Sequence, residues 1–463
     1  MPFPFVLPTT RSFSFTSFFT CDSHPSLPLT ASTYRGVFRD TLKKYKRLSP
    51  AEQVAYLPTV FSSLNDYIPY LFAIDQGLSN QILSGQLVSI VLQSTPTLEW
   101  RPTLSDSLLP GRRISKIKVE SLEYEIYFTL STLAYTHTLL AQTSLNPLYS
   151  LDSALPSLEQ RTLIISTASK HLLSAASIHE YLSVCCEQIL IPSPCVDLSQ
   201  YTFKALASLA LAEATLLVVL KDDPYPFIIA QERNKCDKEW MIKPPEMPKV
   251  RANLLARLCL AAAEHASKGL SILSNASSDG KGKINHDLLK YMEEFKSTSQ
   301  GKACRFLGIG AELNGQIGTA IAWLQAGMYQ LGMSAEDTKM RGLKRLKKDW
   351  EGKKLEKKSQ WGADAGKLEE LRILDLLEYK WSKENDTINA QPIPPVGPLI
   401  AMMPSGREIH SLKPFIPPVI EASILESLKS SDSSDELAEE SESVDSKACS
   451  EIQSNYSCGG GYF

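Results

Sequence analysis

One segment of the chain, residues 203–221, limits its fold more than any other. It reads FKALASLALAEATLLVVLK, contains neither glycine nor proline, and consists mainly of good helix formers. Its leucine, alanine and valine residues would cover nearly every side of a helix, so other helices must surround it. The segment ends at Asp222-Asp223-Pro224, because proline cannot continue a helix. The pattern therefore predicts a buried core helix.

A membrane span is the alternative for this segment. Its nineteen residues would cross a hydrocarbon core of about 30 Å. However, Glu213 lies near the middle, and a charge at the centre of a span costs about 2.5 kcal/mol or more. Lys204, Ser208 and Thr215 make the segment more polar still. We therefore expect a soluble core helix.

Composition places the chain among soluble globular proteins. Of its 463 residues, 21% are charged and 43% hydrophobic, and the net charge of −3 gives no reason to expect nucleic acid as a partner. The nine cysteines form no CxxC pair and no obvious disulfide framework. This usage indicates a reducing compartment, and we expect a cytoplasmic protein.

Hydrophobic periodicity predicts a succession of helices around the core helix. Residues 1–24 are expected to be extended and to form strands, with a targeting peptide as the alternative, and residues 94–113 are expected to be a loop. The expected helices cover residues 34–47, a segment from Pro50 to Leu64, 70–75, 121–142, 158–190, 250–273, 287–295, 303–331 and 367–383. Such a series, without an internal repeat, favours an all-α stack of antiparallel hairpins.

The C-terminal part changes character twice. Residues 391–418 are rich in proline, which excludes helix, and we expect them to lie in extended form over a domain that covers residues 1–425. Residues 426–463 are rich in serine and acids, so we expect a disordered tail. Before these, the basic run 339–358 is either a phosphate or acidic-lipid contact or a solvated helix face.

No motif for catalysis or metal binding stands out. His171 and His179 have no Cys/His cluster around them and are expected at polar edges of a helix. Gly308, Gly310, Gly315 and Gly318 miss the spacing of a dinucleotide loop and are expected to allow close helix packing. The stretch Ser299-Gln-Gly-Lys302 has the bare SxxK pattern without a companion motif. We therefore expect no enzyme, no cofactor and no metal.

Five stretches, in order, resemble the BRO domain family, the helical scaffold modules of ALIX and its fungal relatives. They are LEYEIYFTLSTLAYTHTLLAQ, TASKHLLSAASIHEYL, LASLALAEATLLVVLK, GQIGTAIAWLQAG and KENDTINAQPIPP. The third is similar to a family helix with an LAQAQE core, which Glu213 and Thr215 interrupt here. The ending GREIHSLKPFIPP and the overall length are most similar to the pH-response regulators of fungi.

The resemblance implies a mainly α fold: a curved helical domain with a tetratricopeptide-like core and a small sheet near the N-terminus. It also implies an adaptor that binds the C-terminal amphipathic helix of an ESCRT-III core subunit. Carried onto this sequence, the family's contacts fall on Val218, Lys221 and Ile228. Val218 and Ile228 have an alternative as ordinary core residues. Arg407 is a further candidate, either for a partner carboxylate or for fastening its segment to the domain.

Three hypotheses of function remain, the first two from this resemblance and the third from the basic run. The first is an adaptor of ambient alkaline pH signalling, which links a plasma-membrane sensor to ESCRT-III so that a transcription factor is activated by proteolysis. The second is a general adaptor of endosomal sorting. The third is a protein that binds a membrane surface through residues 339–358. The first two imply recruitment from the cytoplasm to the plasma membrane or to endosomes.

Overall fold

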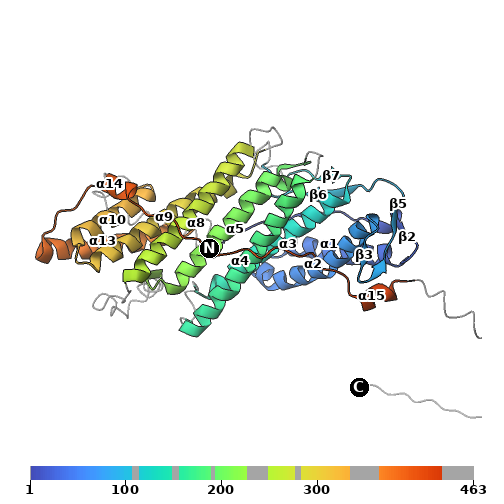
Figure 1. Ribbon diagram of the computed structural model, residues 1–463, viewed down its shortest axis with the longest axis horizontal. Helices are drawn as coiled ribbons and strands as arrows, with labels where there is room; N and C mark the ends of the chain where they lie inside the picture. The colour runs from blue at the N-terminus through green and yellow to red at the C-terminus, as the bar shows by residue number, and fades with distance from the viewer. Residues whose placement is uncertain are drawn as a thin grey trace, which may run out of the picture.

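The protein is mainly helical in the computed structural model, which describes residues 2–106, 114–148, 156–188, 193–226, 249–276, 283–333 and 364–429. The long helices lie side by side along the molecule, from α1 and α2 at one end to α10 and α13 at the other (Figure 1). Helices that follow one another in the described sequence pack against one another. Their bounds are α1 Leu27–Arg47, α2 Pro50–Leu78, α3 Leu122–Leu145, α4 Leu158–Glu187, α5 Gln200–Asp222, α8 Lys249–Ala276, α9 His286–Glu312, α10 Ile317–Gln330 and α13 Lys367–Glu384.

The prediction for the core helix is confirmed. Helix α5 packs between α4 and α8, and most of its residues are buried. Among the described residues it is the single helix long and apolar enough to cross a membrane, but 72% of its most apolar window is buried inside the protein. The apolar character of α5 is therefore explained by its neighbours in the stack.

Short strands form small sheets at the end that holds α1 and α2. Strand β6 (Leu98–Arg101) pairs antiparallel with β1 (Thr9–Thr10) and with β7 (Ile117–Val119). The other strands are β2 (Phe19–Cys21), paired with β5 (Ile90–Leu92), and β3 (Ile82–Leu83), paired with β4 (Gln86–Leu87). The N-terminal strands were expected, but a loop over the whole of 94–113 was wrong. Leu98 and Trp100 alternate with polar residues and are buried, because β6 covers the core with one face only.

Most helix predictions hold in position, and three were wrong in extent. Helix α1 begins at Leu27, seven residues before the expected start. Helix α2 is continuous through Pro58 and Pro69, because leucine and aromatic residues on both sides of the prolines are buried against α1 and α3. Helix α9 is continuous across the expected gap at 296–302.

The break that the sequence placed at 296–302 lies instead at Gly315. This residue has a φ of +72°, a left-handed conformation that glycine adopts without strain. Inside α9, Gly301 lies so close to Leu331 that an added Cβ would come within 3.1 Å of its side chain. The small and polar residues at 298–301 therefore mark close helix packing rather than a loop. Gly308 likewise faces the backbone of Ala320, as expected for a packing glycine. For Gly315 that expectation was wrong, because an added Cβ there would have no neighbour within 4 Å and the residue serves the turn instead.

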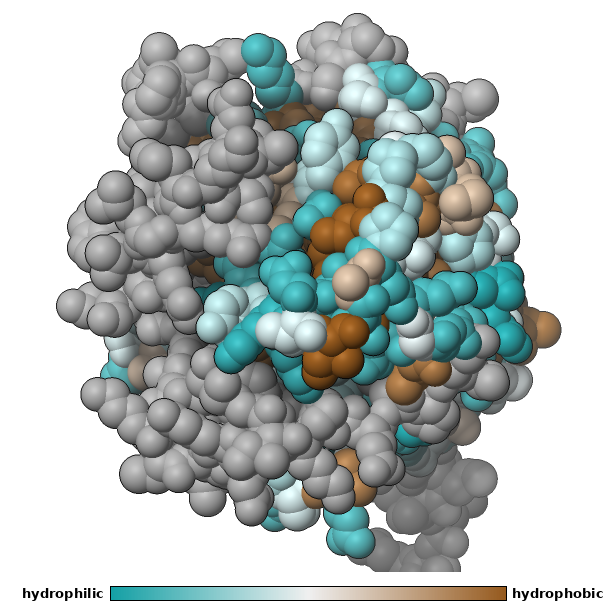
Figure 2. Space-filling view, turned by 90° about the vertical axis from the view of Figure 1, so that its left-hand side faces the viewer, coloured by the Kyte–Doolittle hydropathy of each residue, from teal (hydrophilic) through white to brown (hydrophobic). Residues whose placement is uncertain are grey.

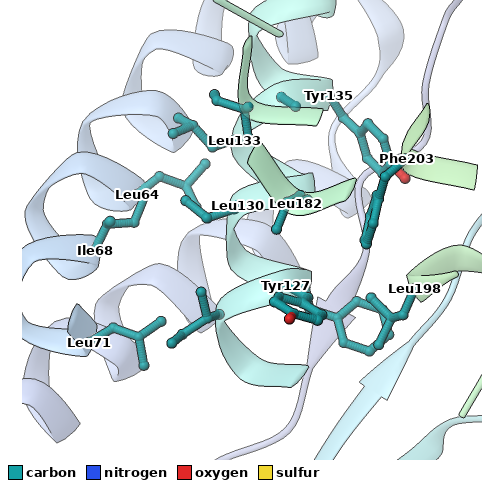
Figure 3. Packing of buried hydrophobic residues seen from close by; sticks show 14 of the residues in the cluster. Leu64, Ile68, Leu71, Tyr127, Leu130, Leu133, Tyr135, Leu182, Leu198 and Phe203 are labelled. Carbon is teal, nitrogen blue, oxygen red and sulfur yellow. The ribbon is translucent and has the colours of Figure 1, made fainter. Parts of the chain in front are cut away.

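Two large hydrophobic clusters fill the stack. The first joins the N-terminal segment, the strands and α1–α5, and Figure 3 shows its side chains converging from α2, α3, α4 and α5. Leu64, Ile68 and Leu71 of α2 face Leu130 and Leu133 of α3 in this view. The second cluster joins the end of α5 with α8, α9, α10 and α13. Helices α5, α8 and α9 contribute to both clusters and so connect the two halves.

A buried ion pair lies within the first cluster. Arg35 of α1 donates from Nε to Oε1 of Glu125 on α3 over 2.7 Å, and both side chains are fully buried. The same carboxylate accepts from the hydroxyl of Tyr67 on α2 and from the indole N–H of Trp100 on β6. Glu125 therefore connects three helices and a strand, and each of its oxygens has donors.

A second ionic cluster lies between α5, α9 and α13. The guanidinium of Arg305 donates to Asp223 over 3.1 Å and to Glu370 over 2.6 Å, and all three side chains are buried. Lys302 donates to the same Glu370 over 2.7 Å. The interaction with Asp223 holds the residue that follows the last turn of α5.

Glu213, in the middle of α5, is buried as well. Its Oε1 accepts from the backbone N–H of Phe3 over 2.9 Å and from the hydroxyl of Tyr291 over 2.8 Å. Burial raises the pKa of this carboxyl to about 7. Glu213 thus positions the N-terminal segment, whose Phe3 and Phe5 pack on Tyr291 and Tyr135.

Of the two histidines of α4, His179 is not at a polar edge, so that expectation was wrong for it, whereas His171 is half-buried. His179 is buried against Tyr135 and Phe203, and burial lowers its pKa to about 3. His171 lies with its Nδ1 2.9 Å from Nδ1 of His137 on α3. Both histidines therefore belong to helix packing.

After α13, the chain makes a π-helical turn at Asn385–Asn389 and a short helix, α14 (Val396–Ala401). The expectation that residues 391–418 contain no helix was therefore wrong. Pro398 lies in the first turn of α14, where a helix needs no backbone N–H from it. Residues 402–421, here named the strap, then run extended across α8 and α4 to α15 (Ala422–Ser427) at the other end of the molecule (Figure 1). The strap is fastened by the N–H of Arg407 to the carbonyl of Arg257, by Ser177 to the carbonyl of Lys413, and by Ser84 to the carbonyl of Ile420. The basic run 339–358 and the tail from 430 lie outside the described residues.

We predict that Glu125→Gln destabilises the fold by about 3–5 kcal/mol, because the Arg35 cation would stay buried without its partner. Urea denaturation followed by circular dichroism measures the loss. Glu99→Gln is the matched control, since Glu99 pairs with Arg11, whose side chain is 64% exposed. We expect less than about 1 kcal/mol from that change. A loss below that value for Glu125→Gln would contradict the role given to the buried pair.

A second prediction concerns pH. The pKa of Glu213 is raised from 4.5 to about 7 in the folded protein. The protonated carboxyl therefore contributes its whole stabilisation of the fold below about pH 4.5, and this contribution is lost as the pH rises through 7. Glu213→Gln keeps an acceptor and removes the titration. As the pH rises from 4.5 to 8, the free energy of unfolding of Glu213→Gln should therefore increase by about 3 kcal/mol relative to that of the wild type.

Unfolding midpoints measured across this range test that prediction. Tyr291→Phe is the control, because it removes one donor and leaves the buried carboxyl in place. Because the lost hydrogen bond lowers the pKa of Glu213, that variant should keep the titration and show a pH dependence at least as large as that of the wild type. If Glu213→Gln also keeps the pH dependence of the wild type, a titrating group other than Glu213 causes it.

Candidate functional site

The candidate site lies at the C-terminal end of α5. The helix stops where Asp223 leaves helical geometry, with its N–H still bonded to the carbonyl of Val219. Its carboxylate is held by Arg305 at the same time. The last turn of α5, which carries Val218 and Lys221, is therefore fixed in place by a buried ion pair.

The structure separates the two candidates on this turn by their exposure. Lys221 is exposed, and its cation is therefore accessible to a partner. Val218 is half-buried and packs against the second hydrophobic cluster. Val218 thus belongs in part to the core, as the alternative interpretation expected. The rest of its side chain is exposed to solvent.

A small pocket of about 60 Å³ opens beside this turn. Leu216, Leu217 and Leu220 of α5 contribute its apolar wall, and Leu145 at the end of α3 adds to it. Val218 does not line it, because a residue two positions from Leu216 and from Leu220 lies on the opposite side of a helix. These leucines could not be singled out from the sequence, because residues 216–220 are all apolar and the pattern does not show which of them are exposed.

Charged groups line the other side of the pocket. Glu213, Asp223, Lys302 and Glu369 contribute to its wall. Lys302 and Asp223 are already paired with Glu370 and Arg305, and burial raises the pKa of Glu369. The one signal in the sequence that pointed here was Glu213, a carboxylate in the middle of an apolar helix.

Helix α4 adds exposed apolar surface near the end of α5. Ile165 and Leu172 of α4 share a small hydrophobic cluster with Ala214 and Leu217 of α5, so the start of α4 lies beside the end of α5. On this part of α4, Leu158 and Leu163 are 67% and 66% exposed. The leucines of α4 and α5 together with Lys221 therefore offer an apolar surface with a positive charge.

The other two candidates, Ile228 and Arg407, do not lie on this surface in the part of the chain that the structure describes. Ile228 falls among residues 227–248, outside the described residues. Arg407 lies on the strap over α8, where its backbone N–H bonds to Arg257 and its side chain is exposed. The backbone of the segment thus does the fastening, and the guanidinium faces solvent.

The pattern Ser299-Gln-Gly-Lys302 forms no catalytic pair. The hydroxyl of Ser299 donates to the carbonyl of Phe295 over 2.8 Å within α9, and Lys302 is paired with Glu370. Among the described residues, no group of three or more His, Cys, Asp or Glu side chains could hold a metal ion.

A second candidate surface lies at one end of the stack. Figure 2 shows the end formed by α10, α13 and α14, where the hydrophobic residues visible among the described ones form separate patches bordered by hydrophilic residues. Tyr329 and Tyr379 are each 65% exposed in these helices.

Comparison with known proteins agrees with this architecture. Residues 86–414 match the model of the BRO1-like domain. By structure, the chain is similar to ALIX in complex with the SIVmac239 PYKEVTEDL late domain, with a TM-score of 0.57 and 16% identity over 90% of this chain, which spans 50% of that ALIX chain. It is also similar to the ALIX BRO1 domain in its CHMP4C complex, with a TM-score of 0.53 and 16% identity over 90% of this chain and 96% of that one.

Sequence relatives carry the same name in three fungi. The pH-response regulator protein palC of Emericella nidulans is 39% identical over 91% of this chain and 90% of its own. The palC protein of Cryptococcus neoformans is 27% identical over 90% of this chain and 92% of its own, and that of Yarrowia lipolytica is 22% identical over 89% and 93%. The chain therefore belongs to the BRO1-like domain family, and it is similar over nearly its whole length to the palC pH-response regulators.

Proposed function

We propose that the protein is a non-enzymatic adaptor of the ambient alkaline pH signalling pathway, and that it acts by binding an ESCRT-III core subunit. The observation that carries the proposal is its 39% identity to a pH-response regulator across 91% of the chain. The matching domain model supports a scaffold rather than a catalyst. The ALIX BRO1 domain, which has the same fold, forms a complex with CHMP4C.

The guest is the C-terminal amphipathic helix of the ESCRT-III subunit. A helix of this kind needs exposed apolar side chains at helical spacing and a positive group for its acidic side. At the end of α5, the half-buried Val218 and the exposed Lys221 are three residues apart and share one side of the helix, and the partly exposed Leu216 and Leu220 lie on the other side, toward the pocket. In this proposal Ile228, shortly after α5, extends the same surface, and the exposed Arg407 binds a carboxylate of a partner.

The proposal extends to a wider role in pH response, which the name of these relatives supports. The adaptor joins a plasma-membrane pH-sensing complex to ESCRT-III, so that the transcription factor PacC is activated by proteolysis. It acts from the cytoplasm and is recruited to the plasma membrane or to endosomes. A general adaptor of endosomal sorting is the alternative. Deletion of the gene separates the two, because loss of growth at alkaline pH with normal cargo sorting supports the signalling role.

A membrane-surface role through residues 339–358 is the third candidate. It rests on charge alone, because this run holds eight lysines and two arginines against three acidic residues. Flotation with liposomes that contain anionic lipids tests it. Reversing the charge of several of these lysines should abolish flotation. Unchanged flotation, or none by the wild type, counts against this role.

We predict that Lys221→Glu weakens binding of the full chain to a labelled C-terminal peptide of a fungal ESCRT-III core subunit by about tenfold or more. The change places a negative charge against the acidic side of the guest helix, and the exposed position should leave stability unaltered. Fluorescence anisotropy with a scrambled peptide beside the native one measures the affinity. Lys268→Glu, on the exposed surface of α8, is the matched control and should bind as the wild type does.

Val218→Ala separates a contact residue from a core residue. Loss of affinity at a stability close to that of the wild type assigns Val218 to the interface. Loss of stability of about 1 kcal/mol with unchanged affinity assigns it to the second hydrophobic cluster alone. No saturable binding by the wild type would remove the proposed partner and leave the family assignment standing.

A further inference from the structure

The strap carries a proline motif whose exposed side is arranged for a partner. Its residues 413–418 read Lys-Pro-Phe-Ile-Pro-Pro, which contains the spacing PxxP from Pro414 to Pro417. The ring of each proline fixes φ near −65°, and a residue before proline is restricted to extended conformations. Five of these six residues are therefore constrained by the sequence itself, and Phe415 is the exception. Such a segment favours the polyproline II helix.

Exposure along this segment repeats with the three-residue period of that helix. Lys413, Ile416 and Val419 are all exposed, and Ile416, at 81%, is the most exposed large hydrophobic residue among those described. Leu412 and Phe415, also three apart, pack against the first hydrophobic cluster. One edge of the extended segment is thus buried in the domain, and another edge points to solvent.

Contacts with α4 fix this orientation. The ring of Phe415 packs edge-on against Tyr181 with a centroid distance of 5.3 Å, and Ser177 donates to the carbonyl of Lys413 over 2.7 Å. Farther along, Ile420 is buried and its carbonyl accepts from Ser84. Because the segment is held on both sides of Ile416, little conformational entropy would be lost when a partner binds it.

We propose that residues 413–417 are a docking site for an SH3-type domain. Domains of this kind bind a polyproline II ligand in grooves between aromatic rings, and each groove takes one x-Pro pair. Lys413-Pro414 and Ile416-Pro417 are two such pairs, one helical turn apart. The residue between them must point away from the partner, and here it is Phe415, which is anchored on Tyr181.

Charge supports the same class of partner. Lys413 is exposed and forms no ion pair with the residues that the structure describes. Its ammonium lies at one end of the motif, where an acidic side chain beside the aromatic grooves could bind it. The inference is independent of the ESCRT-III interaction proposed above, which uses the end of α5.

A second PxxP spacing in the chain gives an internal comparison. Residues 391–395 read Gln-Pro-Ile-Pro-Pro, but there the first x-Pro pair is occupied by the fold. The side chain of Gln391 accepts from the N–H of Gly318 and donates to the carbonyl of Gly315. The residue between the pairs, Ile393, is the one exposed to solvent, at 46%. This motif therefore presents the wrong side and should not bind.

The experiment uses the full chain as the probe on an array of purified SH3 domains from a fungal proteome, with WW and EVH1 domains on the same array. Binding to any SH3 domain is then titrated. We expect at least one Kd of about 1–100 µM. Ile416→Asp should weaken it at least tenfold, whereas the matched Ile393→Asp should bind as the wild type does. Both substitutions are at exposed positions, and equal melting temperatures confirm that the variants are folded.

Several results would overturn the proposal. Absence of SH3 binding by the full chain does so, and so does an equal loss for both variants. Binding by an isolated 408–420 peptide but not by the full chain would show that the strap hides the motif. Binding to WW or EVH1 domains alone would assign a different class of partner.

Discussion

The ion pair between Arg35 and Glu125 is the interaction on which the N-terminal half depends. Removing two charges from water costs several kcal/mol for each ion, so such a pair is tolerated only where further donors complete it. Here Tyr67 and Trp100 supply them, from α2 and from β6. The observed packing of α1, α2, α3 and the sheet satisfies all four groups. We infer that the pair favours this arrangement more than it adds net stability, because a packing that separated the two charges would leave one of them buried without a partner.

The second ionic cluster links the fold to the candidate site. Arg305 holds Asp223 and Glu370 together, and so connects the end of α5 with α9 and α13. Since Asp223 is the residue at which α5 stops, the interaction that joins the two halves also positions the last turn of that helix. The half-buried Val218 and the exposed Lys221 are presented from a rigid helix end. A partner that binds there would meet a surface that is already ordered.

Sequence patterns were sufficient for the parts of the fold in which local preference and burial agree. The ranges of α5 and α13 follow from hydrophobic periodicity and from their flanking residues. Patterns failed where a distant partner decides the outcome. Small polar residues at 298–301 look like a loop until Leu331 is seen to pack against Gly301, and the buried Glu213 is explained by Phe3, 210 positions away. For the same reason the sequence could suggest the turn that carries Val218, but not which side of it is open.

The strap shows how proline serves a stacked fold. Helices in a stack contact mainly their neighbours, so the two ends of the molecule are coupled only through the helices between them. An extended segment covers more than 3 Å per residue, twice the rise of a helix, and twenty residues are enough to run from α14 to α15. Its prolines lower the entropy of the unfolded chain and prevent pairing with a further strand. Because the strap is fastened at Arg407, Lys413 and Ile420, it joins the ends of the stack and holds one of its own edges toward solvent.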